Sequence, residues 1–235
     1  ELWELSPDFI SDDGAFDALM NYNFAFAVND LFIAEKTKIS IDEFIDRLHQ
    51  IDETYPVQNL YVLQNLLSSH DTERLSSLIQ NPDRKYEHDA NEGNKNYKPG
   101  KPTNEVVEKQ KLVAAFQLLF RGAPMIYYGD EVGMWGADDP HDRKPMIWDD
   151  LVYENEIINE QSGFKTGFGN YTVEQNKNLL ELYKTIIKIR NDNETLKTGT
   201  IKFIYSDNEK RAFAFESVIE DQKTICAFNL GVSDV

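Results

Sequence analysis

The sequence predicts an α/β fold: segments that suit part of a parallel (β/α) barrel, followed by the start of an all-β domain. Apolar runs of strand length and helical periodicities alternate up to residue 196. Two of the strand-like runs lead into charged side chains, and parallel barrels place their functional groups at the carboxyl ends of strands. From residue 199 the pattern changes to short alternating runs, which are typical of antiparallel strands. We therefore expect one domain over residues 1–196 and the beginning of a second, incomplete one over residues 197–235.

Strands and helices are expected to alternate in the first part of the chain. The expected elements are a candidate strand at 16–22, a helix or helical loop at 24–32, a helix at 41–53, a strand at 60–67, a surface loop at 81–102, a helix from Thr103 or Asn104 to Gly122, a strand at 125–131 and a helix with apolar positions from Leu179 to Ile189. Two pairs have the spacing of a capping box, Ser40 with Glu43 and Thr172 with Gln175.

Three short runs in the last part of the chain predict antiparallel strands joined by turns. They lie at 200–205, 211–215 and 224–230. Cys226 stands in the third run, where a small buried thiol is the expected state. Because Cys226 is the single cysteine, the chain cannot form an internal disulfide.

The composition describes a protein that can bury a core and that carries a large negative charge. The chain has 235 residues, 41% of them hydrophobic, and a formal charge of −17. This charge would repel phosphate backbones and anionic membrane surfaces, so nucleic acid is not an expected partner. No apolar run reaches transmembrane length, and we expect no membrane insertion. Because the chain starts abruptly without a methionine, we expect it to be a fragment.

The segment Ser68–Arg74 is the first candidate site. It follows the apolar run 60–67, so His70 and Asp71 would lie just beyond the carboxyl end of a strand. Both residues also have structural alternatives. His70 could be a satisfied core histidine, and Asp71 could cap a short helix.

Three segments, in the right order, resemble motifs of one enzyme superfamily. Residues 66–74 are similar to the His-Asp motif that closes the seventh barrel strand in the α-amylase superfamily of glycoside hydrolases (family 13). Residues 122–131 resemble its eighth strand, and residues 139–143 resemble the substrate-contacting loop after it. Residues 133–136 and 143–146 most resemble the neopullulanase and cyclomaltodextrinase group. The resemblance covers the whole chain and implies the carboxyl-terminal half of a catalytic (β/α)8 TIM barrel, followed by the start of a β-sandwich domain.

The resemblance implies retaining hydrolysis of α-glucosidic bonds. In that reaction one carboxylic acid protonates the leaving oxygen, and a carboxylate about 5–5.5 Å away attacks the anomeric carbon. Glu1 is similar to the glutamate that serves as general acid/base, although its position alone favours a solvated terminal carboxylate. Asp71 matches the family's third carboxylate, which fixes sugar hydroxyls and distorts the ring. The family's aspartate nucleophile precedes that glutamate, so we expect it outside this chain and expect the chain alone to be inactive.

Four further residues are expected to bind substrate by resemblance. His70 would donate a hydrogen bond to a sugar hydroxyl. Asp139 and Arg143 match the loop that grips a sugar on the non-reducing side, with a surface ion pair between them as the alternative. Trp3 could stack on a sugar face or lie in the core.

Other residues near these motifs are expected to be structural. Four charged residues would brace the mouth of the barrel, namely Glu73, Arg74, Asp130 and Glu131. Two aromatic residues would lie in the core, namely Tyr127 and Tyr128.

The expected partners are α-glucan oligosaccharides: pieces of starch-derived glucans, maltodextrins or cyclodextrins. An α-glucan transglycosylase and a catalytically silent glucan-binding protein are the alternatives. No cofactor is expected; some amylases use calcium, but no residue pattern here identifies a calcium site. Analogy with exported glucan-degrading members favours a periplasmic or secreted location. A half barrel would expose strand edges and apolar helix faces, so we expect self-association or a partner chain.

Overall fold

A computed structural model describes residues 6–10, 14–86 and 88–231 of the chain. Its helices are α1 (Ser6–Phe9), α2 (Tyr22–Val28), α3 (Ile41–Thr54), α4 (Val57–Leu60), α5 (Leu75–Gln80), α6 (Asn104–Leu119), α7 (Lys177–Asp192) and α8 (Glu194–Thr198). Its strands are β1 (Gln64–Asn65), β2 (Ala123–Pro124), β3 (Glu156–Ile158), β4 (Gly169–Tyr171), β5 (Thr200–Asp207), β6 (Ala212–Ile219) and β7 (Gln222–Asn229). Single turns of 3-10 or π helix lie at Asn29–Ile33, Asp130–Val132, His141–Arg143 and Glu160–Ser162. No helix within the described ranges is long and apolar enough to cross a membrane.

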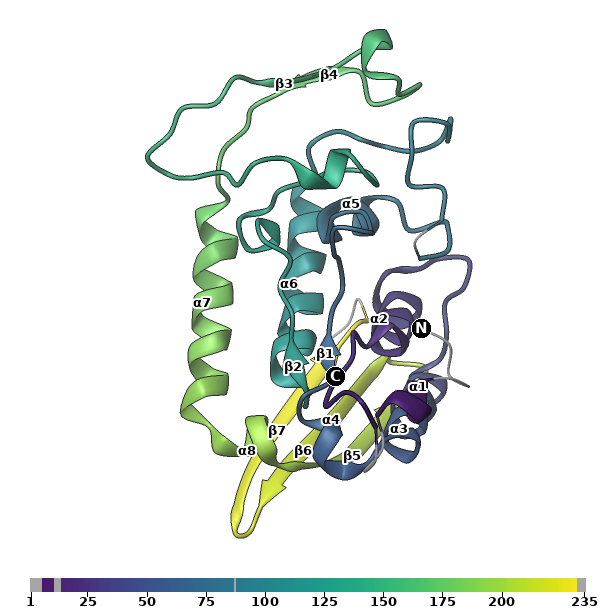
Figure 1. Ribbon diagram of the computed structural model, residues 1–235, viewed down its shortest axis with the longest axis vertical. Helices are drawn as coiled ribbons and strands as arrows, with labels where there is room; N and C mark the ends of the chain where they lie inside the picture. Colours follow the sequence, from purple (N-terminus) through teal and green to yellow (C-terminus); the bar gives the residue numbers. More distant parts are fainter. Residues whose placement is uncertain (1–5, 11–13, 87, 232–235) are drawn as a thin grey trace.

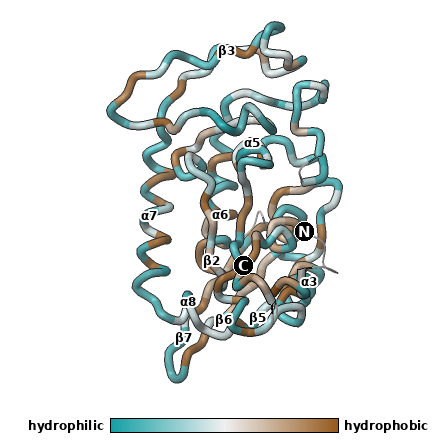
Figure 2. Tube along the Cα trace, viewed as in Figure 1, coloured by the Kyte–Doolittle hydropathy of each residue, from teal (hydrophilic) through white to brown (hydrophobic). Residues whose placement is uncertain are grey.

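The long helices α6 and α7 run side by side, and the sheet of β5, β6 and β7 crosses one end of the molecule (Figure 1). The β3–β4 hairpin lies at the opposite end, above α5 (Figure 1). Hydrophobic segments gather where the sheet meets α3, and the loops around α5 are mostly hydrophilic (Figure 2). Four candidate site residues lie at exposed positions in the connections that follow β1 and β2, namely His70, Asp71, Asp139 and Arg143.

Besides the antiparallel β3–β4 hairpin, the first part contains three short parallel segments. Gln64 of β1 pairs with Met20 on one side and with Ala123 of β2 on the other, and both pairings are parallel. The Met125 N–H extends the second pairing by donating to the Asn65 carbonyl (3.1 Å). Helices connect the segments, so the first part is a mixed α/β unit whose parallel segments lie in chain order.

The predicted strand boundaries are wrong in three places. Only Met20 of the run 16–22 forms a bridge, the run 60–67 pairs only at Gln64–Asn65, and the strand expected at 125–131 pairs at Ala123–Pro124. Gly122 explains the last difference. With φ at +118° it lets the backbone approach the Asn65 side chain, where an added Cβ would lie 2.5 Å from Nδ2. This turn starts the pairing before the apolar run begins.

The starts of the long helices follow local capping chemistry. Ser40 caps α3 by accepting a hydrogen bond from the N–H three residues on (3.1 Å), and Thr103 caps α6 in the same way, which confirms both predicted starts. The capping box predicted at Thr172 and Gln175 is wrong. The α7 helix begins after Asn176, whose side chain accepts from the third N–H of the helix (3.0 Å).

Strands β5, β6 and β7 form an antiparallel sheet in that order, as the alternating runs predict. The sheet packs on α3 and α6 through phenylalanine rings. Phe116 lies fully buried at the centre, with ring centroids 5.3 Å from Phe32, 5.3 Å from Phe44 and 5.4 Å from Phe228. Cys226 is buried in the same cluster, and burial raises the pKa of its thiol to about 11. The sheet and the helices therefore share one core.

Arg190 connects α7 to the end of α6 and the start of β2. Its guanidinium donates to the carbonyls of Leu118 (2.9 Å), Phe120 (2.8 Å) and Gly122 (2.6 Å). Carbonyls at the end of a helix have no partner inside the helix, so a buried arginine satisfies them. This contact fixes the position from which β2 and the loop after it leave the core.

Candidate functional site

The loop that follows β1 turns two side chains into solvent. The Ser69 N–H donates to Thr72 Oγ1 (2.8 Å) and the Asp71 N–H donates to Ser69 Oγ (3.1 Å), which closes a tight turn. The His70 and Asp71 side chains are each 59% exposed. His70 is therefore not a core histidine, and Arg74 rather than Asp71 occupies the N-cap position of α5.

The loop that follows β2 brings Asp139 and Arg143 to the same place. Arg143 Nε lies 3.1 Å from Asp139 Oδ1, and Arg143 Nη2 lies 3.7 Å from Asp71 Oδ1. On the other side, His70 Nε2 lies 3.2 Å from Asp71 Oδ1. Asp139 and Arg143 thus form the surface ion pair that was the alternative expectation, and Arg143 also faces Asp71. We call these four residues the Asp71 cluster.

The Asp71 cluster is suited to binding rather than to holding the fold together. All four side chains stand in the loops, and the charged ones are between 44% and 59% exposed. Exposed ion pairs contribute at most about 1 kcal/mol to stability. A carboxylate, an imidazole and a guanidinium that point into solvent can instead form hydrogen bonds to sugar hydroxyls. The arrangement can therefore hold a neutral polyhydroxylated ligand.

Two buried charged residues, Arg74 and Asp130, lie next to the loop that carries His70 and Asp71. Arg74 is fully buried and lies 3.6 Å from Asp130 Oδ1, while Ser68 donates to the other carboxylate oxygen. Burial raises the pKa of Asp130 to about 6, and the Arg74 charge opposes that rise. The guanidinium lies 4.6 Å from the ring centroids of both Tyr127 and Tyr128. Tyr128 is 39% exposed, so the prediction that it lies in the core is wrong.

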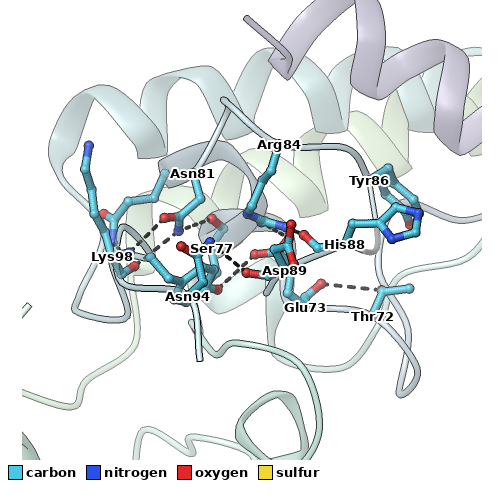
Figure 3. A network of polar contacts seen from close by, with 12 residues as sticks. Thr72, Glu73, Ser77, Asn81, Arg84, Tyr86, His88, Asp89, Asn94 and Lys98 are labelled. Atoms are coloured by element: carbon cyan, nitrogen blue, oxygen red, sulfur yellow. Dashed lines mark hydrogen bonds and ion pairs between the residues drawn. The ribbon is translucent and has the colours of Figure 1, made fainter. Parts of the chain in front are cut away.

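A second buried ion pair anchors the long loop 81–102 beside the cluster. Arg84 donates to Glu73 and, through its other terminal nitrogen, to the His88 carbonyl (2.8 Å); Figure 3 shows the Arg84 and Glu73 side chains facing each other. Tyr97 donates to the second Glu73 oxygen (2.9 Å). Burial raises the pKa of Glu73, although Arg84 and Tyr97 lower it. The loop is therefore attached to the segment that carries His70 and Asp71.

Asp142 is a buried carboxylate that the sequence analysis missed. It lies between Pro140 and Arg143, has no exposed surface, and neither carboxylate oxygen has a hydrogen-bond partner among the described residues. Burial raises its pKa to about 6; the Arg143 charge lowers this value and the charges of Asp139 and Asp138 raise it. The only sequence signal is its place inside the motif 139–143, because burial cannot be read from a polar loop.

We expect Asp142→Asn to stabilise the protein at neutral pH. A carboxyl whose folded pKa lies above its unfolded value costs stability as pH rises between the two values, here from 3.8 to about 6. The gain in Tm of the variant should be absent near pH 3.5, grow up to about pH 6 and then stay constant. Thermal unfolding from pH 3.5 to 8 measures it, with the exposed Asp150→Asn as control. A gain that is equal at all pH values would contradict this account.

Two predicted site residues, Glu1 and Trp3, lie outside the described residues. Within the described ranges, no group of three or more His, Cys, Asp or Glu side chains is arranged to hold a metal ion. The site that can be described is thus the Asp71 cluster with its buried braces.

Comparison with known proteins places these residues in a family. A family model for the α-amylase catalytic domain matches residues 8–199. The chain is 30% identical to neopullulanase 2 of Thermoactinomyces vulgaris over 222 residues, which are 94% of this chain and 30% of that protein. It is 34% identical to a cyclomaltodextrinase of Geobacillus thermopakistaniensis over 209 residues, which are 89% of this chain and 27% of that protein. A solved cyclomaltodextrinase structure superposes with a TM-score of 0.70 at 30% identity, over 97% of this chain and 31% of that one.

The matched region contains both loops of the Asp71 cluster. The chain spans about 30% of the length of these relatives. The family match confirms the resemblance inferred from the motifs, including its relation to neopullulanases and cyclomaltodextrinases. The chain therefore belongs to the α-amylase family and carries a part of its catalytic domain.

Proposed function

We propose that the protein containing this chain is a retaining glycoside hydrolase that cleaves α-glucosidic bonds in starch-derived glucans, maltodextrins or cyclodextrins. The observation that carries the proposal is the Asp71 cluster, in which two loops far apart in sequence bring a carboxylate, an imidazole and a guanidinium together. Membership of the α-amylase family and similarity to a neopullulanase and a cyclomaltodextrinase support the substrate class.

In the proposed mechanism, carboxylates act in sequence on one glucosidic bond. Glu1 protonates the leaving oxygen, and an aspartate supplied from outside this chain attacks the anomeric carbon to form a glycosyl-enzyme intermediate. Glu1, now deprotonated, takes a proton from the water that releases the product. Asp71 accepts hydrogen bonds from hydroxyls of the reacting sugar, and these bonds strengthen as positive charge develops on the ring.

The remaining residues of the cluster bind and orient the sugars. His70 donates a hydrogen bond to a hydroxyl of the reacting sugar. Arg143 and Asp139 hold the neighbouring sugar on the non-reducing side, because a planar guanidinium matches vicinal hydroxyls and a carboxylate accepts from them. Trp3 would stack on a sugar face.

The proposed architecture is the carboxyl-terminal half of a (β/α)8 barrel over residues 1–196, followed by the start of a β-sandwich over residues 197–235. Met20, β1 and β2 would be the sixth, seventh and eighth barrel strands, since they are parallel and adjacent in chain order. Strands β5–β7 would begin the sandwich. The open edge of such a half barrel would be covered by the rest of the barrel or by a second copy of the chain.

The proposal predicts that the intact gene product hydrolyses α-glucans and that residues 1–235 alone do not. The isolated chain has the proposed acid/base and Asp71, but the covalent step requires a nucleophile. The hydrolytic activity of both proteins is measured as the release of reducing sugar from maltodextrin, cyclodextrin and pullulan. The control is the intact protein carrying Glu1→Gln. Turnover by the isolated chain would refute the assignment of roles. If the intact protein binds maltodextrin without turnover, the glucan-binding alternative replaces hydrolysis, and transfer products in place of free sugar would indicate a transglycosylase.

A further inference from the structure

Two long connections meet beside the Asp71 cluster and share a small core of their own. One is the loop 81–102, here called the Tyr97 loop, and the other is the segment 144–172 that contains the β3–β4 hairpin, here called the arm. The shared core is an apolar cluster separate from the main one, made of Ala90, Tyr97, Ala137, Ile158 and Phe164, with Tyr171 packed against it. The Tyr97 loop, the arm and the loop between β2 and the arm all contribute to it.

Backbone hydrogen bonds join the same segments. The Asp138 N–H donates to the Ala90 carbonyl (2.8 Å), which places the start of the Asp139 loop (residues 138–143) against the Tyr97 loop. Thr166 of the arm donates through its hydroxyl to the Tyr97 carbonyl. Lys101 Nζ donates to the Thr172 carbonyl (3.0 Å) at the end of the arm. The Tyr97 loop thus forms hydrogen bonds with the Asp139 loop and, at two points, with the arm.

Two glycines show how closely the arm approaches the Tyr97 loop. At Gly163, with φ of +86°, an added Cβ would lie 2.5 Å from Glu92 Oε2. At Gly167, with φ of +67°, an added Cβ would lie 2.7 Å from Pro99 Cδ. Both positions need glycine for their backbone conformation, and at Gly167 the Pro99 ring also leaves no space for a side chain. The arm therefore passes close to the Tyr97 loop at both glycines.

His141 connects the Asp139 loop to this assembly. Its Nε2 lies 2.9 Å from Glu92 Oε1 of the Tyr97 loop, and its ring centroid lies 4.8 Å from that of Phe164 in the arm. The His141 side chain is 26% exposed, whereas Arg143, two residues on, is 44% exposed. Arg143 faces Asp71 and pairs with Asp139, and His141, which lies between Asp139 and Arg143 in the sequence, faces the arm and the Tyr97 loop.

The ion pairs of Arg143 alone cannot fix its position. Its carboxylate partners, Asp139 and Asp71, are themselves more than half exposed, and such pairs form and break readily in water. On its other side the loop contacts Phe164, which is 4% exposed, and Glu92, which is 49% exposed, so the ring contact with Phe164 is the better shielded of the two.

In the short helical turn His141–Arg143, Asp142 is buried but its carboxylate has no hydrogen-bond partner among the described residues. The contacts of His141 with Glu92 and Phe164 are therefore the side-chain contacts that join this turn to the Tyr97 loop and the arm.

We propose that His141 is a positioning residue, held by Glu92 and Phe164, which fixes the Asp139 loop so that Arg143 and Asp139 meet a sugar beside Asp71. This inference rests on the proposed glucan-hydrolysing function. The Tyr97 loop and the arm then act as one wall of the sugar site, and the affinity for the sugar on the non-reducing side depends on how firmly that wall holds the loop.

The test uses variants of the intact protein and steady-state kinetics on a maltodextrin series. His141→Ala should raise KM about 5-fold, the loss expected from one hydrogen bond and a ring contact that order a binding loop, and should change kcat less than 2-fold. His141→Gln keeps a polar group that can reach Glu92 and should recover part of the affinity. His88→Ala is the matched control, because that exposed side chain lies on the same Tyr97 loop and its carbonyl contact with Arg84 is kept.

The same substitution in a second variant distinguishes a positioning role of His141 from a general effect on the stability of the protein. In a protein that already carries Arg143→Ala, adding His141→Ala should raise KM by a smaller factor than in the unchanged protein, because Asp139 is then the sugar-binding residue that the loop still presents. Equal fold-changes in the two backgrounds, or an unchanged KM in the single variant, would overturn the proposal.

Amide hydrogen exchange gives a readout that does not depend on turnover. In the His141→Ala protein, exchange across residues 138–143 should become faster, while exchange in α6 should not change. If the intact protein turns over no α-glucan but this exchange rises, the proposed function fails and the positioning of the loop stands. If glucans are hydrolysed and neither KM nor exchange changes in the variant, the function stands and the positioning role is refuted.

Discussion

Replacing Asp71 by asparagine in the intact protein is expected to lower kcat on maltodextrin by about 10³-fold. The carboxylate lies 59% exposed at the centre of the cluster, within ion-pair distance of Arg143 and His70. Asparagine keeps the size of the side chain but removes the negative charge that stabilises an oxocarbenium-like ring. Because exposed ion pairs contribute little to stability, Tm should change by less than about 2 °C.

The control for this variant is Asp83→Asn, which removes an exposed aspartate whose one ion pair within the described part of the chain is with Lys36 at 3.8 Å. Its kcat should stay within a factor of two of the unchanged protein. A kcat for Asp71→Asn within 10-fold of the unchanged protein would show that Asp71 does not act on the transition state. The cluster would then be a surface ion-pair group.

Replacing Arg84 by methionine is expected to destabilise the protein by about 3–5 kcal/mol, the cost of leaving one buried charge without its partner. The Glu73 side chain is only 2% exposed and has Arg84 and Tyr97 as partners. Methionine fills similar space without the charge. Thermal unfolding of the intact protein at pH 7 measures the effect, and Lys85→Met, at the exposed neighbouring position, is the control.

The destabilisation should depend on pH in a defined direction. Burial already raises the folded pKa of Glu73, and removal of Arg84 raises it further. A carboxyl with a folded pKa above its unfolded value loses stability as pH rises between the two values, so the variant should recover towards acid pH. Adding Glu73→Gln should also restore much of the stability at pH 7. A loss that is the same at pH 5 and pH 8 would mean that Glu73 is not the group left unpaired.

Helices were predictable from the sequence where their starts depend on neighbouring residues. Ser40 and Thr103 cap α3 and α6 because a hydroxyl and an N–H three residues on are enough to start a helix. The start of α7 was missed because the chain from Thr172 to Gln175 is held by the arm and by Lys101, contacts that no local pattern contains. Asn176 then takes the capping role.

Strand boundaries were less predictable because partners set them. The apolar run beginning at Met125 looks like a strand, but Gly122 turns the backbone against Asn65 and the parallel pairing starts at Ala123. The antiparallel strands after residue 199 were predicted well, since adjacent strands joined by tight turns carry their pattern locally.

In the candidate site, too, some residues could be identified from the sequence and others only from the fold. His70, Asp71, Asp139 and Arg143 were identified by their resemblance to family motifs, and the structure brings all four together. Asp142 was missed, since its importance comes from burial. Its neighbours are exposed and its own carboxylate is not, a difference that only the folded loop reveals.

The most direct test of the central claim is the configuration of the first product. Proton NMR recorded during the first minutes of maltodextrin hydrolysis by the intact protein distinguishes α from β anomers before they interconvert in solution. Retention through a glycosyl-enzyme intermediate predicts that the α anomer appears first. A β anomer as first product, or no product from any α-glucan, would contradict the assignment of this chain to a retaining α-glucan hydrolase.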